Sequence, residues 1–277
     1  VEGKAGANIA SPFVVRVHHI SELPDGNWYL VMDLIKGKPL SEYIDTEIRS
    51  NEQQVLQWMK QCCEGMAAAA KKGIVHRDLK PSNILIASGS NAVRICDFGL
   101  ARRVAAEKPA PDALDEGMKE DKDSGSPPDQ PGDSHVGKED EYKTRPGTFL
   151  GTAAYAAPEQ ARNSRQAIER SDIYSFGATF YHLLTGVRPY RNLNAHQIVR
   201  MHRGLEEPLV LEKPRKLNPK LSVETSDLIM RCLEKDPAQR FESFAALDKE
   251  LENREPTRSG VEWFLEEGRS HLRNGDP

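Results

Sequence analysis

The order of hydrophobic patterns along the 277-residue chain constrains its fold most strongly. Residues 13–20 and 28–35 are rich in β-branched and aromatic side chains, and a Pro-Asp-Gly turn at residues 24–26 joins them. This arrangement predicts an antiparallel pair of strands. From residue 52 onward, helical periodicity dominates. Strands followed by a long run of helices predict an α+β fold whose larger part is mainly α.

The longest predicted helix covers residues 52–72 and ends at Gly73, because glycine favours helix C-termini. Further helices are predicted over residues 171–184, 194–203 and 222–234, with one or two more between 243 and 271. Short apolar segments predict small strands or loops, and they lie at residues 74–75, 84–86 and 93–95.

Residues 104–143 have a different composition, with five prolines and with 12 acidic residues against five lysines. Such a segment cannot bury enough apolar surface to offset its ordering entropy, so we predict a disordered insertion. Its net charge of −7 leaves +3 on the rest of the chain. A solvated linker is the simplest role, and a regulatory role is the alternative.

The overall composition excludes several partner classes. A net charge of −4 and a pI near 6.1 argue against nucleic acid or an anionic membrane surface. The sequence contains no apolar run of 18 residues, so it predicts no membrane-spanning segment. Four cysteines without a C-x-x-C pair favour a reducing cytoplasm, and no cluster of His, Cys and carboxylates has the spacing of a protein metal cage.

Three short motifs occur in a fixed order: HRDLKPSN at residues 76–83, DFG at 97–99 and APE at 157–159. Any one of them would be weak, but together they match the signature set of protein kinases. The chain resembles this family from about residue 2 to residue 251, apart from the insertion. The sequence of residues 157–186 most resembles the eukaryotic-like serine/threonine kinases of bacteria. The resemblance implies a protein-kinase-like fold.

The resemblance also implies domain boundaries. Residues 1–35 would form a residual small lobe with the end of helix αC and strands 4 and 5. Residues 36–255 would form the large lobe, and residues 256–277 a helical tail. The chain starts at Val1, and neither a G-x-G-x-x-G loop nor a V-A-I-K lysine precedes Glu2. We therefore expect the front of the small lobe to be missing and residues 1–277 alone to be inactive or weakly active.

Five residues would carry the chemistry, and the catalytic ones are Asp78, Lys80 and Thr152. The resemblance implies that Asp78 accepts or orients the proton of the acceptor hydroxyl, and that Lys80 neutralises the γ-phosphoryl group of ATP. Lys80 and Thr152 both indicate Ser or Thr acceptors in protein substrates. Asn83 and Asp97 supply the hard oxygen ligands that Mg²⁺ prefers, with Mn²⁺ as an alternative ion.

The nucleotide pocket is implied by the same resemblance. Glu2 would be the αC glutamate, and Met32 would be the gatekeeper residue. The residues expected to contact the nucleotide are Asp33 and Ile35 through their backbone, Leu40 and Leu85 on the pocket floor, and Lys80. Ordinary core packing remains the alternative for each apolar residue.

Regulatory and structural roles follow from matching positions. Arg77 would bind a phosphate group on the activation segment, and Thr144 and Thr148 are the best candidates for the phosphorylated residue. Asp172 would anchor the catalytic-loop backbone. Glu159 would pair with Arg240.

Two alternatives remain beside the protein kinase. A pseudokinase or scaffold would bind partners without transfer, although Asp78, Lys80, Asn83 and Asp97 are all present. A small-molecule kinase would lack the APE segment and the Thr152 signature. Expected partners of a kinase are protein substrates and a second copy for trans-autophosphorylation. We expect a cytoplasmic location, with any membrane anchor outside these residues.

Overall fold

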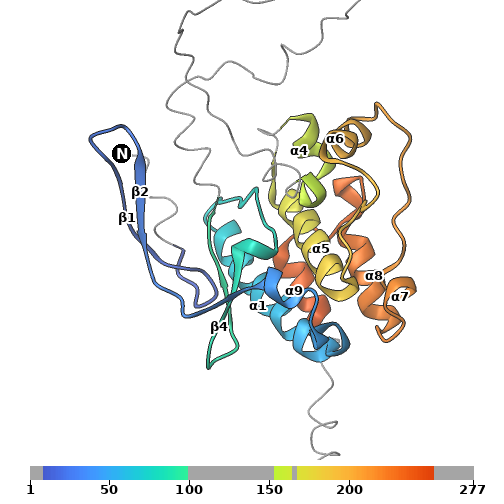
Figure 1. The fold of residues 1–277 in the computed structure, drawn as a ribbon, viewed down its shortest axis with the longest axis horizontal. Helices are drawn as coiled ribbons and strands as arrows, with labels where there is room; N and C mark the ends of the chain where they lie inside the picture. The colour runs from blue at the N-terminus through green and yellow to red at the C-terminus, as the bar shows by residue number, and fades with distance from the viewer. Residues whose placement is uncertain (1–8, 99–152, 164–166, 253–277) are drawn as a thin grey trace, which may run out of the picture.

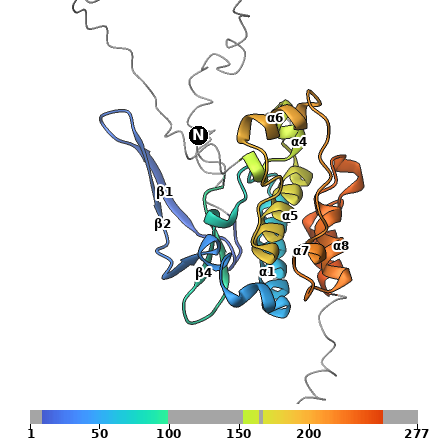
Figure 2. The same cartoon turned by 45° about the vertical axis from the view of Figure 1, so that its right-hand side comes forward.

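The computed structural model describes residues 9–98, 153–163 and 167–252. A two-stranded hairpin projects from one side of a larger body, which contains a small sheet and all the described helices (Figures 1 and 2). The mixed helix and sheet content confirms the predicted α+β class.

The hairpin consists of β1 (Val17–Glu22) and β2 (Trp28–Met32), paired antiparallel as predicted. Gly26 has a positive φ of 84°, which suits the tight turn between them. The predicted strand starting at residue 13 was too long. The backbone of Phe13 and Val15 bonds instead to Ile95, at 2.8 Å for both Ile95 N to Phe13 O and Val15 N to Ile95 O. Residues 13–15 therefore belong with the second sheet.

The second sheet has the antiparallel order β3-β4-β5, with β3 at Gly37–Pro39, β4 at Ile84–Ala87 and β5 at Val93–Ile95. β4 and β5 were predicted, whereas the sequence of β3 contains Gly and Pro and carries no strand signal. Residues 74–75, for which small strands or loops were predicted, form a loop. The amide of Ile74 bonds to the Ala69 carbonyl at 3.1 Å and so closes the preceding helix.

Helix α1 (Glu52–Ala70) matches the long predicted helix. Asn51 caps its start by accepting the Gln54 amide at 3.1 Å, and Gly73 takes the left-handed φ of 67° just after its end. The helix packs against β5 and against the last described helix. Trp58 on its buried face donates its indole N–H to the Asn91 carbonyl at 3.0 Å.

Helix α5 (Glu169–Thr185) is the centre of the larger body, with 14 of its 17 residues buried. A helix that is buried on all sides packs against several neighbours, and α5 contacts α1 and α8 among others (Figure 1). The other helices are α4 (Pro158–Arg162), α6 (Ala195–Arg203), α7 (Pro214–Leu217), α8 (Val223–Cys232) and α9 (Phe244–Glu252).

One main core joins these elements. Its largest fully buried aromatic side chains are Trp58, Tyr174, Phe176, Phe180 and Phe244. All four cysteines of the chain are buried and free, so none forms a disulfide, in agreement with the sequence. No helix in residues 9–98, 153–163 and 167–252 combines the length and the apolar character needed to cross a bilayer. The predicted insertion and helical tail lie outside the described residues.

Candidate active site

Asp172 anchors the loop that carries the HRD motif. It lies on α5, is 1% exposed, and accepts the backbone amides of His76 at 2.6 Å and Arg77 at 2.8 Å. Burial raises the pKa of Asp172 to about 7, while the two amide bonds and the Arg77 charge act in the opposite direction. A side chain far along the sequence thus holds the loop backbone, which is the contact that the family resemblance implied.

His76 joins the HRD loop to the segment between β5 and the DFG motif. Its Nδ1 lies 3.3 Å from the Asp78 amide and must accept that bond, so Nε2 carries the proton and donates it to the Cys96 carbonyl at 3.0 Å. Burial lowers the pKa of His76, which favours this neutral form. The ring also packs against Phe98 in a tilted arrangement, with 4.6 Å between the ring centroids. Sequence reasoning gave His76 no role, although its place in the motif was the available signal.

Asp78, Lys80 and Asn83 come together on this loop. The Lys80 ammonium donates to Asp78 Oδ2 at 2.8 Å, and Asn83 Nδ2 donates to the Asp78 carbonyl at 2.9 Å. The Asp78 side chain is 39% exposed, whereas Asn83 is 6% exposed. Asp78 therefore presents a solvent-accessible carboxylate beside a cation, on a loop that Asn83 holds in shape.

Asn83 and Asp97 are neighbours because the backbone of β4 and β5 meets there. The Cys96 amide donates to the Asn83 carbonyl at 3.0 Å, and Asp97 follows Cys96 directly. Burial, with the Asp97 charge next, raises the pKa of Cys96 to about 12, so its thiol stays protonated and lies 3.4 Å from Asp97 Oδ2. Cys96 was not singled out from the sequence.

The donor set of Asn83 and Asp97 fits Mg²⁺. Because the amide nitrogen of Asn83 is used by the Asp78 carbonyl, its Oδ1 is the remaining ligand atom, together with the Asp97 carboxylate. The described residues contain no group of three or more His, Cys, Asp and Glu side chains able to hold a metal. Mg²⁺ does not need such a group, since it usually takes its other ligands from water and phosphate.

Met32 and Asp97 line one small hollow between the hairpin and the DFG segment. The remaining lining residues are Val15, Val17, Leu30, Cys96 and Phe98. The predicted gatekeeper and the predicted metal ligand thus line the same hollow. The hollow lies between β2 and the residues that follow β5.

The other predicted nucleotide contacts are dispersed. The Asp33 amide bonds to the Arg16 carbonyl at 3.0 Å and its side chain pairs with His18 at 2.6 Å, while Ile35 is half-buried. Leu40 is completely buried in the main core, and Leu85 is half-buried on β4. Leu40 packs in the core, and its contact with the nucleotide stays a prediction.

Glu159 and Arg240 form a buried two-pronged ion pair, with 2.7 Å from Nη1 to Oε1 and 2.9 Å from Nη2 to Oε2. Ser171 adds a hydrogen bond to Oε1 at 2.7 Å. Burial acts to raise the pKa of Glu159, but the Arg240 hydrogen bonds and charge and the Ser171 bond outweigh it, and the pKa lies below its ordinary value. The pair that the resemblance implied is present and fastens α4 to the segment between α8 and α9.

Several predicted positions cannot be placed. Glu2, Thr144, Thr148 and Thr152 lie outside the described residues. Arg77 lies within the described residues. It is exposed next to Asp78, as binding of a phosphate would require.

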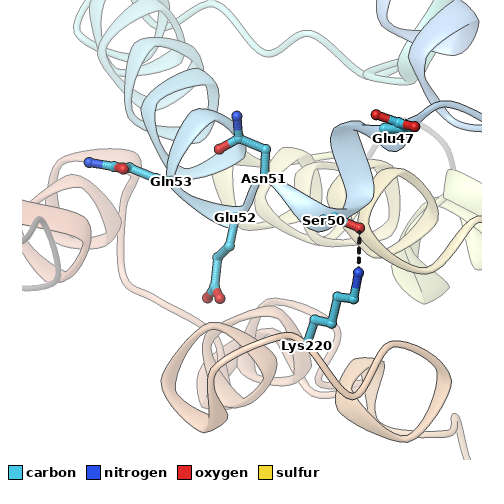
Figure 3. Close-up of a pocket in the computed structure, with 6 residues that line it drawn as sticks. All are labelled: Glu47, Ser50, Asn51, Glu52, Gln53 and Lys220. Carbon is cyan, nitrogen blue, oxygen red and sulfur yellow. Dashed lines mark hydrogen bonds between the residues drawn. The ribbon is translucent and has the colours of Figure 1, made fainter. Parts of the chain in front are cut away.

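A separate polar hollow contains none of the motif residues (Figure 3). Lys220 donates to Ser50 Oγ there at 3.3 Å, and Asn51 is already the cap of α1. The hollow is lined by Glu47, Ser50, Asn51, Glu52, Gln53 and Lys220. The candidate active site is therefore the HRD and DFG region.

Comparisons with known proteins agree with this assignment. The protein kinase domain family matches residues 1–121 and 132–251. A serine/threonine-protein kinase PknA of Corynebacterium glutamicum is 30% identical over 244 residues, covering 87% of this chain and 43% of that protein. PknB of Mycobacterium tuberculosis is 29% identical over 253 residues, covering 90% and 34%. The chain thus spans about two-fifths or less of the length of these curated relatives.

Solved structures agree on the fold. The crystal structure of the Mycobacterium tuberculosis PknI kinase domain matches with a TM-score of 0.58 at 19% identity, covering 91% of this chain and 76% of that one. The family match covers most of the chain, and the motif residues meet at one site. The chain therefore belongs to the protein kinase family, among the eukaryotic-like serine/threonine kinases of bacteria.

Proposed function

We propose that this chain carries the transfer site of a serine/threonine protein kinase, which moves the γ-phosphoryl group of ATP to Ser or Thr hydroxyls of proteins. The observation that carries the proposal is the grouping of Asp78, Lys80 and Asn83 on one anchored loop, with Asp97 beside it. Family membership and the names of the relatives support the same activity.

In this proposal, the Asp78 carboxylate takes the proton of the incoming hydroxyl. The hydroxyl oxygen bonds to the γ-phosphorus, the bond from phosphorus to the β,γ-bridging oxygen breaks, and ADP leaves with that electron pair. Lys80, 2.8 Å from Asp78, puts positive charge next to the transferring group. Mg²⁺ bound by Asn83 and Asp97 would neutralise phosphate charge.

The remaining assignments are proposals from the resemblance. Thr152 would support Asp78 and shape the site for short hydroxyl side chains. The nucleotide would contact Glu2, Met32, Asp33, Ile35, Leu40 and Leu85. Arg77 would receive a phosphate on Thr144 or Thr148, formed by transfer between two copies of the chain.

The four buried free cysteines support a reducing compartment, so we place the domain in the cytoplasm. Protein substrates are the expected partners. The described residues offer no specific observation in favour of a scaffold without catalysis.

Two substitutions test the roles in the complete gene product. Asp78→Asn should lower transfer by at least about a hundredfold while Mg-ATP still binds, because Asp78 faces the acceptor hydroxyl. Asp97→Asn should weaken Mg²⁺ and ATP binding together. Asp227→Asn, on the exposed face of α8 where Asp227 pairs with Lys213, is the matched control.

Radiolabelled phosphate transfer and titration of Mg-ATP separate the two roles. Undiminished transfer by Asp78→Asn would refute the proton-accepting role. Unchanged Mg-ATP affinity in Asp97→Asn would refute the metal site.

A further inference from the structure

The backbone of Arg77, just before Asp78, is held in an unfavourable conformation. Arg77 has a φ of 71°, in the left-handed region that residues with a Cβ atom rarely adopt. Such a conformation persists only where surrounding groups hold it. The direction of the Asp78 side chain depends on this backbone, so the groups that hold it influence catalysis.

Three hydrogen bonds hold this peptide segment. The Arg77 amide donates to Asp172 at 2.8 Å, and the Asp78 amide donates to His76 Nδ1 at 3.3 Å. The Arg77 carbonyl accepts the third bond, from Gln160 Nε2 at 3.0 Å. Gln160 has no role in the assignments above, and it reaches this loop from α4, across 83 positions of sequence.

The orientation of the Gln160 amide is defined by both partners. Its Oε1 accepts the Ala157 amide at 3.0 Å, in a capping arrangement at the start of α4. Since an amide N–H can only donate and a carbonyl can only accept, the Nε2 group must face Arg77. The preceding residue, Glu159, is paired with Arg240, so the Gln160 amide projects from a fixed helix start.

We propose that Gln160 is a positioning residue that links the end of the activation segment to the catalytic loop. When α4 is seated, Gln160 holds the Arg77 carbonyl, and the Asp78 carboxylate keeps its direction. When α4 moves, this bond is lost and the left-handed Arg77 backbone relaxes. The inference deepens the proposed function and rests on it, because the consequence for transfer requires Asp78 to act in transfer.

Gln160→Glu isolates the bond. The carboxylate can still accept the Ala157 amide, but it cannot donate to the Arg77 carbonyl. Gln197→Glu is the matched control: Gln197 occupies the same capping position in α6, where its Oε1 accepts the Asn194 amide at 2.9 Å. Both substitutions add one negative charge at a helix start, and only the first affects the loop.

Two measurements are made on the complete gene product. Hydrogen exchange at the Arg77 and Asp78 amides reports the loop independently of transfer, and steady-state kinetics with ATP and a peptide acceptor report its consequence. Losing one hydrogen bond should speed exchange by roughly three- to tenfold and lower kcat by about tenfold, with KM for ATP unchanged. The control should match the wild type in both.

The results distinguish failure of the positioning role of Gln160 from failure of the proposed function. If Gln160→Glu matches Gln197→Glu in exchange, or loses kcat without faster exchange, the positioning role is overturned. Faster exchange with wild-type kcat also overturns it. Faster exchange in Gln160→Glu beside a wild type that transfers no phosphate would support the link and overturn the proposed function instead.

Discussion

Replacing Arg240 with methionine should destabilise the larger body severely without changing Asp78, Lys80, Asn83 or Asp97. The Arg240 side chain is 0% exposed, and all five of its N–H groups are used. Two of them bond to Glu159, and the other three bond to backbone carbonyls of Arg170, Glu234 and Lys235. Methionine keeps much of the volume and provides none of these donors.

The expected magnitude follows from what remains after the substitution. Glu159, whose side chain is 14% exposed, would keep Ser171 as a partner and lose its counter-charge. Breaking a buried ion pair on one side costs about 3–5 kcal/mol of the free energy of unfolding. Three carbonyls also lose donors, so we expect the upper part of that range. A domain of this kind has about 5–15 kcal/mol in total, so a large share of its stability would be lost.

Further variants of the Glu159–Arg240 pair show whether the lost charge or the lost donors cause the destabilisation. Glu159→Gln should cost less than Arg240→Met, because glutamine can still accept from Ser171 and from one Arg240 N–H. Arg240→Lys retains the charge but has at most three donors in a different geometry, and it should be intermediate. The double variant should cost less than the sum of the two single changes, since neither charge is then left unpaired.

Urea denaturation followed by circular dichroism at pH 7 measures these differences. Arg200→Met is the control, because Arg200 and Glu206 form an ion pair of 2.9 Å with both side chains about one-third exposed. Solvent screens that pair, and its loss should cost less than about 1 kcal/mol. Equal losses in Arg240→Met and Arg200→Met would refute the argument that burial makes the first pair structural.

Two further predictions concern other buried positions. His202 is 3% exposed, and its burial, followed by the Lys235 charge, lowers its pKa to about 4. The unfolded chain therefore binds this proton more tightly than the folded chain, and stability falls as the pH drops from about 6.5 toward 4. His202→Phe should remove about 2 kcal/mol of the loss between pH 7 and pH 5 in denaturation experiments, and identical pH profiles would contradict this. A Cβ atom at Gly177 would lie 2.6 Å from the Cys232 Cβ, so Gly177→Ala should push α5 from α8 and cost about 1–3 kcal/mol. An unchanged denaturation midpoint would show that the helices can separate freely.

The limits of sequence-based prediction are visible in particular elements. The α1 helix and its end near Gly73 were predictable, because a long amphipathic period and a terminal glycine are local signals. The start of β1 was not, since residues 13–15 bond to Ile95 through backbone groups that carry no side-chain pattern. The short helix α4 escaped prediction because five residues are too few to show a period.

The motifs by themselves determined the family and predicted the reacting residues and their chemistry, because catalysis requires particular side chains at particular spacings. Tertiary structure alone decided how those side chains are held. The neutral tautomer of His76 depends on Cys96, and the loop peptide depends on Asp172 and Gln160. These bonds join residues far apart in sequence through backbone atoms that every residue possesses. A backbone acceptor leaves no trace in the identity of its residue, so only the folded arrangement reveals which donor meets it.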